Sequence, residues 1–343
     1  MPLFALIYCA LTTGAIVIEY VHASKFGNDF GVYWRAAHQP LSEVYFWKGR
    51  FPFPYAPTML LWVAPLAFVP KWLAYFLFVG SSIAAFVLAC RPYLRIRGIA
   101  LALISPPAAR GLFTGQVCAV LAALMIWACG TGSRIAAGVA FGVIASIKPQ
   151  LVIMAPLMLA LNRDWRAFLA AGSTFSLIVA VAVVLLGPER WPEWIGSMNH
   201  FYHAVTDTGV ITVSTSPAAV AERFGYAPLP FLLLGTLLGA TTVYLCREAQ
   251  PLEKAAAIGV GSIMAAPYAL AYDLTVVMPV LALATLQGRI TAAFGLGTPY
   301  HPLPLIVSIY ELVRTRFAAF GSRTSKEDAV DCQAAGLPID EAA

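Results

Sequence analysis

The chain has 343 residues, of which 60% are hydrophobic and only 11% are charged. Soluble domains contain about 45–50% apolar and about 25% charged residues, so this composition excludes a soluble enzyme, a disordered chain and a secreted disulfide scaffold. The formal net charge is +5, and the basic residues occur in short clusters between apolar runs. In a membrane protein such clusters report orientation and not nucleic-acid binding. We therefore expect a multi-pass protein whose partners include membrane lipids and no nucleic acid.

The first predicted element is the apolar run 2–21, which we expect to be a retained transmembrane helix because no basic segment precedes it and no small-residue cleavage site follows. Polar stretches lie at 22–56 and 188–227. Further apolar runs occupy 57–70, 72–90, 98–112, 115–130, 135–147, 149–162, 167–187, 228–246, 255–270, 272–287 and 303–320. Several are shorter than the ~20 residues that cross a bilayer, so we predict an all-α, polytopic fold with about 8–12 membrane helices. Residues 1–320 form one integral-membrane domain, and the polar tail 321–343 is expected to be disordered.

The basic connectors predict the orientation of the chain in the cell membrane. The connectors placed in the cytoplasm are Arg134, Arg163, Arg166, Arg247 and Lys254. Both polar stretches are then exoplasmic loops, and the aromatic content of 188–227 suits interfacial amphipathic helices. The turns near residues 148 and 268–273 also face outward. Keeping residues 91–97 inside requires an odd number of crossings between 56 and 91, where two apolar runs lie. Either 57–70 or 98–112 is then re-entrant, or the charge rule fails locally.

Metal, disulfide and nucleotide motifs are not evident in the sequence. The six cysteines are scattered, without CxxC or Cys/His metal spacing, so we interpret them as buried thiols. His200 and His203 are three residues apart, but no third ligand lies nearby. No P-loop, Rossmann glycine pattern or nucleophile elbow occurs in a suitable context. We predict no metal site and no cofactor.

Asp29 lies just past the first helix, in an aromatic-rich segment. One interpretation is structural: Asn28 or Asp29 caps a short helix that begins near Phe30. The functional interpretation is a carboxylate at the water–membrane boundary that acts as a general base.

Lys148 is the most unusual residue, because about a dozen apolar residues flank it on each side. Ionisable groups in such positions are expensive unless they face a cavity or a partner, which favours a functional role. The alternative is that Pro149 breaks the helix and Lys148 extends to the interface. An ammonium at a helix break suits a phosphate oxygen. Gln116 lies at a comparable break. Asp273 is a second carboxylate near the membrane, beside tyrosines; one interpretation is an ordinary loop or cap residue, but the orientation above places it on the same side as Asp29 and Lys148.

Several short motifs, in this order and spacing, resemble glycosyltransferase family 87 over residues 25–285. The motifs are Asn28-Asp29-Phe30, Tyr33-Trp34, Ala36-Ala37, Pro54-Tyr55-Ala56-Pro57, Pro65-Leu66-Ala67, Gly115-Gln116, Lys148-Pro149-Gln150, Pro267-Tyr268 and Tyr272-Asp273. The family's second proline-rich motif usually continues into Trp-Asp-His-His. Here Tyr272, Leu274 and Thr275 stand in place of the Trp and both His, so only Asp273 remains.

The resemblance implies a GT-C membrane enzyme that takes a sugar, with mannose the first expectation, from a polyprenyl-phosphate donor and transfers it to a lipid or glycan acceptor. The reaction would invert the anomeric centre on the exoplasmic side. Asp29 matches the family's base, and Lys148 would neutralise the leaving phosphate. Further candidate contacts with the donor sugar or phosphate are Arg35, Tyr55, Gln116, Gln150, Tyr268 and Asp273.

The rival hypothesis is a secondary transporter or flippase of a lipid-linked sugar or another small anionic solute. Broken helices and a buried lysine occur in transporters too. A transporter places its key charges at the bilayer midplane, whereas the polar residues here gather in two external loops, and no repeated halves are visible. The depths of Asp29 and Lys148 would discriminate the two.

Overall fold

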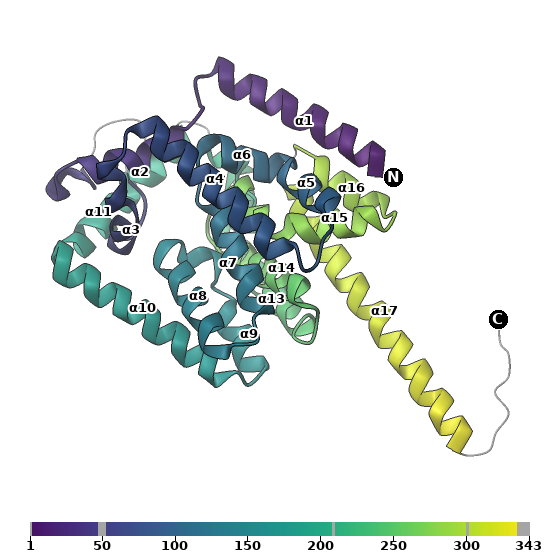
Figure 1. Cartoon of the computed structure of the whole chain (residues 1–343). Helices are drawn as coiled ribbons and strands as arrows, with labels where there is room; N and C mark the ends of the chain where they lie inside the picture. Colours follow the sequence, from purple (N-terminus) through teal and green to yellow (C-terminus); the bar gives the residue numbers. More distant parts are fainter. Residues whose placement is uncertain (1, 47–52, 208–209, 300–301, 335–343) are drawn as a thin grey trace.

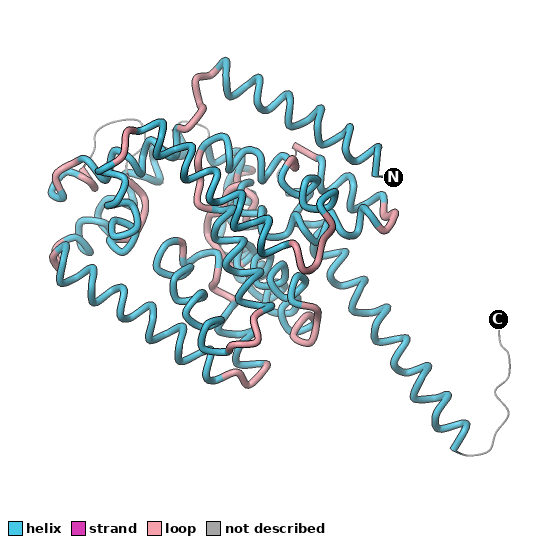
Figure 2. Tube along the Cα trace, viewed as in Figure 1, coloured by secondary structure: helices cyan, strands magenta, loops and turns pink. Residues whose placement is uncertain are grey.

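A computed structural model describes residues 2–46, 53–207, 210–299 and 302–334. Residues 47–52 of the first polar stretch and 335–343 of the tail lie outside this described part. Within it the chain is helical throughout (Figures 1 and 2). The α-helices are α1 (Pro2–His22), α2 (Asn28–His38), α3 (Pro57–Val63), α4 (Lys71–Cys90), α5 (Ile96–Leu103), α6 (Pro106–Thr114), α7 (Cys118–Gly130), α8 (Arg134–Ile147), α9 (Ala155–Leu161), α10 (Trp165–Leu186), α11 (Arg190–Asp207), α12 (Pro217–Arg223), α13 (Pro228–Leu245), α14 (Pro251–Met264), α15 (Met278–Leu286), α16 (Ile290–Gly297) and α17 (Pro302–Ala334). The 3-10 helices are η1 (Leu41–Glu43), η2 (Ala64–Phe68), η3 (Pro149–Leu151), η4 (Val210–Val213) and η5 (Ala271–Val277).

Four helices are long and apolar enough to cross a bilayer: α1, α4, α10 and α13. Shorter apolar segments supplement them at Pro57–Phe68, Cys118–Gly130, Arg134–Ile147 and Ala271–Leu286. This arrangement confirms the predicted all-α, multi-pass class. The count of about 8–12 crossings stays a prediction.

The helices divide into a buried centre and an apolar periphery. Nearly every residue of α14 from Leu252 to Met264 is buried, whereas α10 buries only Ala167 and Ala182. A helix that is apolar all round yet exposed suits a hydrocarbon environment. In Figure 1, α1 and α10 lie along the outside of the bundle, and α17 projects away from it.

Glycines allow two helix pairs to approach closely. Gly138 and Gly142 on α8 face the backbone of α10, and a Cβ at Gly142 would lie 2.7 Å from the carbonyl oxygen of Ala171. On α13, a Cβ at Gly239 would lie 2.7 Å from the carbonyl oxygen of Gly261 on α14. Small residues four positions apart are typical of helix packing in membranes, where backbones meet without intervening side chains.

The segment formed by α3 and η2 begins and ends at the same end of the bundle. At its start, Thr58 Oγ1 donates to the Ser146 carbonyl at 2.5 Å, beside the end of α8. At its end, Trp34 Nε1 on α2 donates to the Val69 carbonyl at 3.2 Å. Which of the runs 57–70 and 98–112 is re-entrant stays a prediction.

The polar tail differs from the sequence expectation over part of its length. Helix α17 continues to Ala334, into the stretch where we expected disorder. The division into a domain of residues 1–320 and a tail stays a prediction.

Candidate active site

A cavity of about 590 Å³ lies where α1, α2, α6, η3, α11 and η5 meet. Six charged side chains line it, three carboxylates and three cations, among the residues that the structure describes. These are Glu19, Lys25, Asp29, Arg110, Lys148 and Asp273. The cavity therefore unites the three charged residues that the sequence singled out, although they are far apart in the chain.

Helix α2 turns one face toward this cavity. Asp29, Val32 and Tyr33 line it, as expected for residues three and four positions apart on a helix. Arg35 is six positions beyond Asp29, on another side of the helix, and it does not line the cavity. The N-cap of α2 is Gly27, at φ 66°, and no side chain caps the helix. The structural interpretation of Asp29 as a capping residue is therefore wrong.

Asp29 is half-buried, and the side chains of Gln116 and Thr114 lie near its carboxyl group. Burial raises the pKa of Asp29 above its ordinary value, and this effect outweighs the opposing influence of Gln116, Thr114 and Lys148. A carboxylate with a raised pKa is a stronger base than an exposed aspartate.

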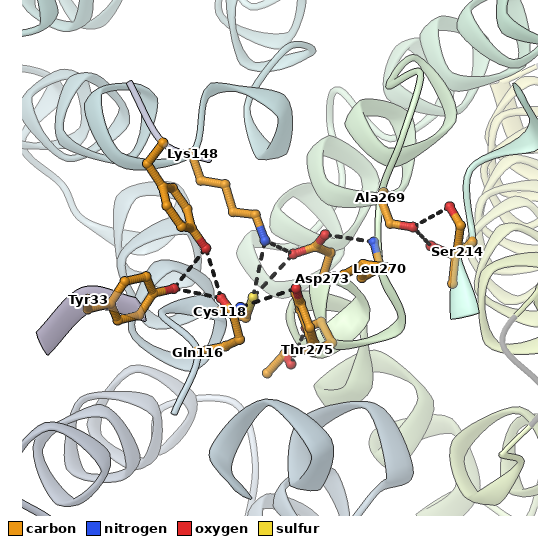
Figure 3. A network of polar contacts seen from close by, with 12 residues as sticks. Tyr33, Gln116, Cys118, Lys148, Ser214, Ala269, Leu270, Asp273 and Thr275 are labelled. Carbon is orange, nitrogen blue, oxygen red and sulfur yellow. Dashed lines mark hydrogen bonds and ion pairs between the residues drawn. The ribbon is translucent and has the colours of Figure 1, made fainter. Parts of the chain in front are cut away.

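Lys148 and Asp273 form a buried ion pair (Figure 3). Lys148 ends α8, and Asp273 lies in the first turn of η5, where its Oδ2 accepts the backbone N–H of Leu270 at 2.9 Å. Between them Cys118, the first residue of α7, donates its thiol to Asp273 Oδ1 at 3.2 Å. The Lys148 ammonium also lies 4.8 Å from the centre of the Tyr272 ring. The pair explains how a lysine is held among apolar helices, because a buried charge needs a partner.

A hydrogen-bond network centred on Gln116 forms a second part of the site (Figure 3). The Tyr33 and Tyr55 hydroxyls donate to Gln116 Oε1 at 2.8 and 3.1 Å, and they lie 2.8 Å from each other. Gln116 Nε2 donates to the Tyr272 hydroxyl at 3.1 Å. Gly115, at φ 75°, allows the break between α6 and α7 to dock against Phe30, the residue after Asp29.

Helix α11 covers the cavity with one amphipathic face. Trp194, Met198, Phe201 and Val205 line the cavity at intervals of three and four residues. The Trp194 indole donates to the Pro54 carbonyl at 3.1 Å and so joins α11 to the segment before α3. The predicted histidine pair on this helix is exposed and belongs to no metal-binding cluster in the described part of the chain.

Seven of the eight residues predicted for the site line the cavity, and Arg35 does not. The seven are Asp29, Tyr55, Gln116, Lys148, Gln150, Tyr268 and Asp273. Sequence reasoning missed Arg110 and Thr114, which lie one turn apart on α6, and it treated Tyr272 only as a departure from a motif. A signal for Arg110 was present, since a lone arginine within an apolar run is a functional candidate.

The fold and the cavity define a multi-pass membrane protein with a polar site among broken helices. A family model for glycosyltransferase family 87 matches residues 53–271, and the chain belongs to this family. It is a membrane glycosyltransferase, whose substrates are a sugar donor and an acceptor. No curated protein and no solved structure matches the chain. The family match includes Tyr55, Gln116 and Lys148, whereas Asp29 and Asp273 lie outside the matched residues.

Proposed function

We propose that this glycosyltransferase transfers a hexose, in the first instance mannose, from a polyprenyl-phosphate donor to a lipid or glycan acceptor, with inversion at the anomeric carbon. The observation on which the proposal depends most is that Asp29 and Lys148 line one cavity. Its volume of about 590 Å³ is in the range of small-molecule sites. The cavity has room for polar head groups, while a prenyl chain remains among the apolar helices.

In the proposed reaction, the acceptor hydroxyl oxygen bonds to the anomeric carbon as the bond from that carbon to the donor phosphate breaks. The hydroxyl proton passes to Asp29, and polyprenyl phosphate leaves with the electron pair. The raised pKa of Asp29, caused by burial, supports its role as the base. Tyr268 and Gln150, which line the same cavity, are proposed contacts for the donor.

Lys148 is proposed to stabilise the charge that develops on the leaving phosphate. An ammonium has three N–H donors, and the contacts with Asp273 and Cys118 account for two. The third can reach a phosphate oxygen. Asp273 would then hold the ammonium in place, and the ion pair lets a cation persist in an apolar setting before the donor binds.

The Tyr55 hydroxyl is proposed to donate to the donor sugar. Tyr33, Tyr55 and Gln116 Oε1 form three close oxygen contacts, but the two phenols supply only two hydrogens. Tyr55 can therefore turn its hydrogen to a ligand while Tyr33 still satisfies Gln116. Arg35 lies outside the cavity and is not part of the proposed contacts.

The test is transfer of radiolabelled mannose from polyprenyl-phosphate-mannose into a membrane lipid fraction by the purified protein. We expect wild-type transfer, a loss of about 100-fold or more in Asp29→Asn, and weaker donor binding with a lower rate in Lys148→Met. Asp164→Asn is the matched control, because Asp164 caps α10 away from the cavity and asparagine can keep that cap.

Near-normal turnover by Asp29→Asn would remove Asp29 from the role of base. If wild type transfers no mannose, other polyprenyl-phosphate sugars are tested next. Failure with all of these, together with movement of labelled lipid-linked sugar across vesicles, would favour the transporter hypothesis over the proposed reaction.

A further inference from the structure

In the unliganded structure, protein side chains occupy three of the four hydrogen-bonding positions of the Gln116 amide. A glutamine amide has two acceptor sites on its oxygen and two N–H donors. Oε1 accepts from Tyr33 and Tyr55, and one N–H is donated to Tyr272. The second N–H is left for Asp29, which lines the same cavity and whose ionised form Gln116 favours. A ligand that bound Oε1 or the first N–H would have to displace one of these three partners, which contrasts with the sequence expectation of a direct donor contact.

The surroundings fix which end of the amide faces Asp29. The two ends of a glutamine amide have nearly the same shape, so hydrogen-bond partners decide their orientation. The Tyr33 and Tyr55 hydroxyls both donate to Oε1, so the NH₂ group is the end that faces Tyr272 and the Asp29 carboxylate. Gly115, the residue before Gln116, packs closely against Phe30, the residue after Asp29: a Cβ at Gly115 would lie 2.6 Å from Phe30 Cβ.

We propose that Gln116 is a positioning residue: held by Tyr33 and Tyr272, it donates an N–H to Asp29 and orients that carboxylate toward the acceptor hydroxyl. This inference deepens the proposed function and depends on Asp29 being the base. Gln116 then acts on the base Asp29, and other side chains of the cavity make the contacts with the donor.

The inference makes a prediction about how Asp29 titrates. Other charged groups around this cavity are Glu19, Lys25, Arg110, Lys148 and Asp273, and tyrosines from α1, α2, the segment before α3 and η5 also face it. A hydrogen bond donated to a carboxylate favours the ionised form and lowers its pKa. Removing the Gln116 N–H should therefore raise the pKa of Asp29 further and keep it protonated at higher pH.

The experiment is an isotope-edited infrared titration of the purified full-length protein, with the Asp29 band identified as the one lost in Asp29→Asn. We expect the Asp29 midpoint to move to higher pH in Gln116→Met and in the isosteric Gln116→Glu, which adds a like charge. The acidic limb of the rate profile for kcat should move in the same direction. At the pH optimum of the wild type, kcat should fall by about tenfold or more, as for a lost hydrogen bond to a charged group.

Gln150→Met is the matched control, since Gln150 lines the same cavity but is not among the groups that shift the pKa of Asp29. Its Asp29 midpoint should equal that of the wild type. The inference is overturned if the Asp29 midpoint stays in place in both Gln116→Met and Gln116→Glu. This holds if KM for the donor rises, as it would for a binding residue. It also holds if kcat falls equally at every pH. The titration needs no turnover, so it tests the Gln116–Asp29 contact even if the proposed reaction is wrong.

Discussion

At the residue scale, the ion pair between Lys148 and Asp273 combines stability with function. Removing one partner of a buried pair leaves an uncompensated charge and costs about 3–5 kcal/mol. We expect Asp273→Asn and Lys148→Met each to lower the unfolding temperature in detergent strongly. The double variant should lose much less than both losses combined, because it buries no unpaired charge. Additive losses in thermal unfolding would show that the two side chains are not coupled.

Asp29 should reduce stability in return for activity. Burial raises its folded-state pKa above the unfolded value near 3.8. Its stabilising contribution is therefore complete below the unfolded value and is lost as the pH rises through the folded-state pKa. Asparagine has no such dependence. We expect Asp29→Asn to unfold at a higher temperature than wild type at neutral pH, with the gap closing on acidification. A less stable variant at neutral pH would contradict this.

The residues of the site were predictable where a polar group interrupts an apolar run. Asp29, Lys148 and Asp273 are conspicuous in this way, and the structure brings them to one cavity. Their pairing was not predictable, because Lys148 and Asp273 are 125 positions apart and meet only after α7 and α14 have packed. Arg35 does not line the cavity, because it lies on another side of α2 and a linear motif does not distinguish the faces of a helix.

At the scale of the element, the break between α6 and α7 positions the centre of the network. Gly115 has φ 75°, and an added Cβ would meet Phe30 on α2. We expect Gly115→Ala to cost roughly 2–6 kcal/mol, from backbone strain and overpacking together, and to reduce transfer because Gln116 moves from Asp29. Gly80→Ala in α4 is the control, as no atom lies within 4 Å of its Cβ position. Equal unfolding temperatures for the two variants would contradict the argument.

The positions of the helices were easier to predict than the way they cross the membrane. Composition and run length predicted the apolar helices, but the two runs between residues 56 and 91 left the membrane orientation of the chain ambiguous. Hydrogen bonds hold the start of 57–70 beside the end of α8 and its end beside α2. Such bonds join distant segments, so no local pattern reports them. The glycine pairs on α8 and α13 were a readable packing signal.

At the scale of the whole molecule, the proposed chemistry requires that the cavity open on the exoplasmic side. Ser42 lies exposed after α2, near the cavity end, whereas Ser133 lies exposed at the start of α8, the end opposite Lys148. The basic residues Arg134, Arg163 and Arg166 gather near Ser133, and such clusters favour the cytoplasmic side. The two serines should therefore face opposite sides of the membrane.

We expect a membrane-impermeant maleimide to label Ser42→Cys in intact cells and to label Ser133→Cys only after the membrane is permeabilised. Cys129 and Cys332 are first replaced by serine; the other four cysteines are buried and should react slowly. Labelling of Ser133→Cys alone in intact cells would invert the orientation and direct the site to cytoplasmic substrates. Both labelled variants should still transfer sugar, because positions 42 and 133 do not line the cavity bounded by α1, α2, α6 and α11.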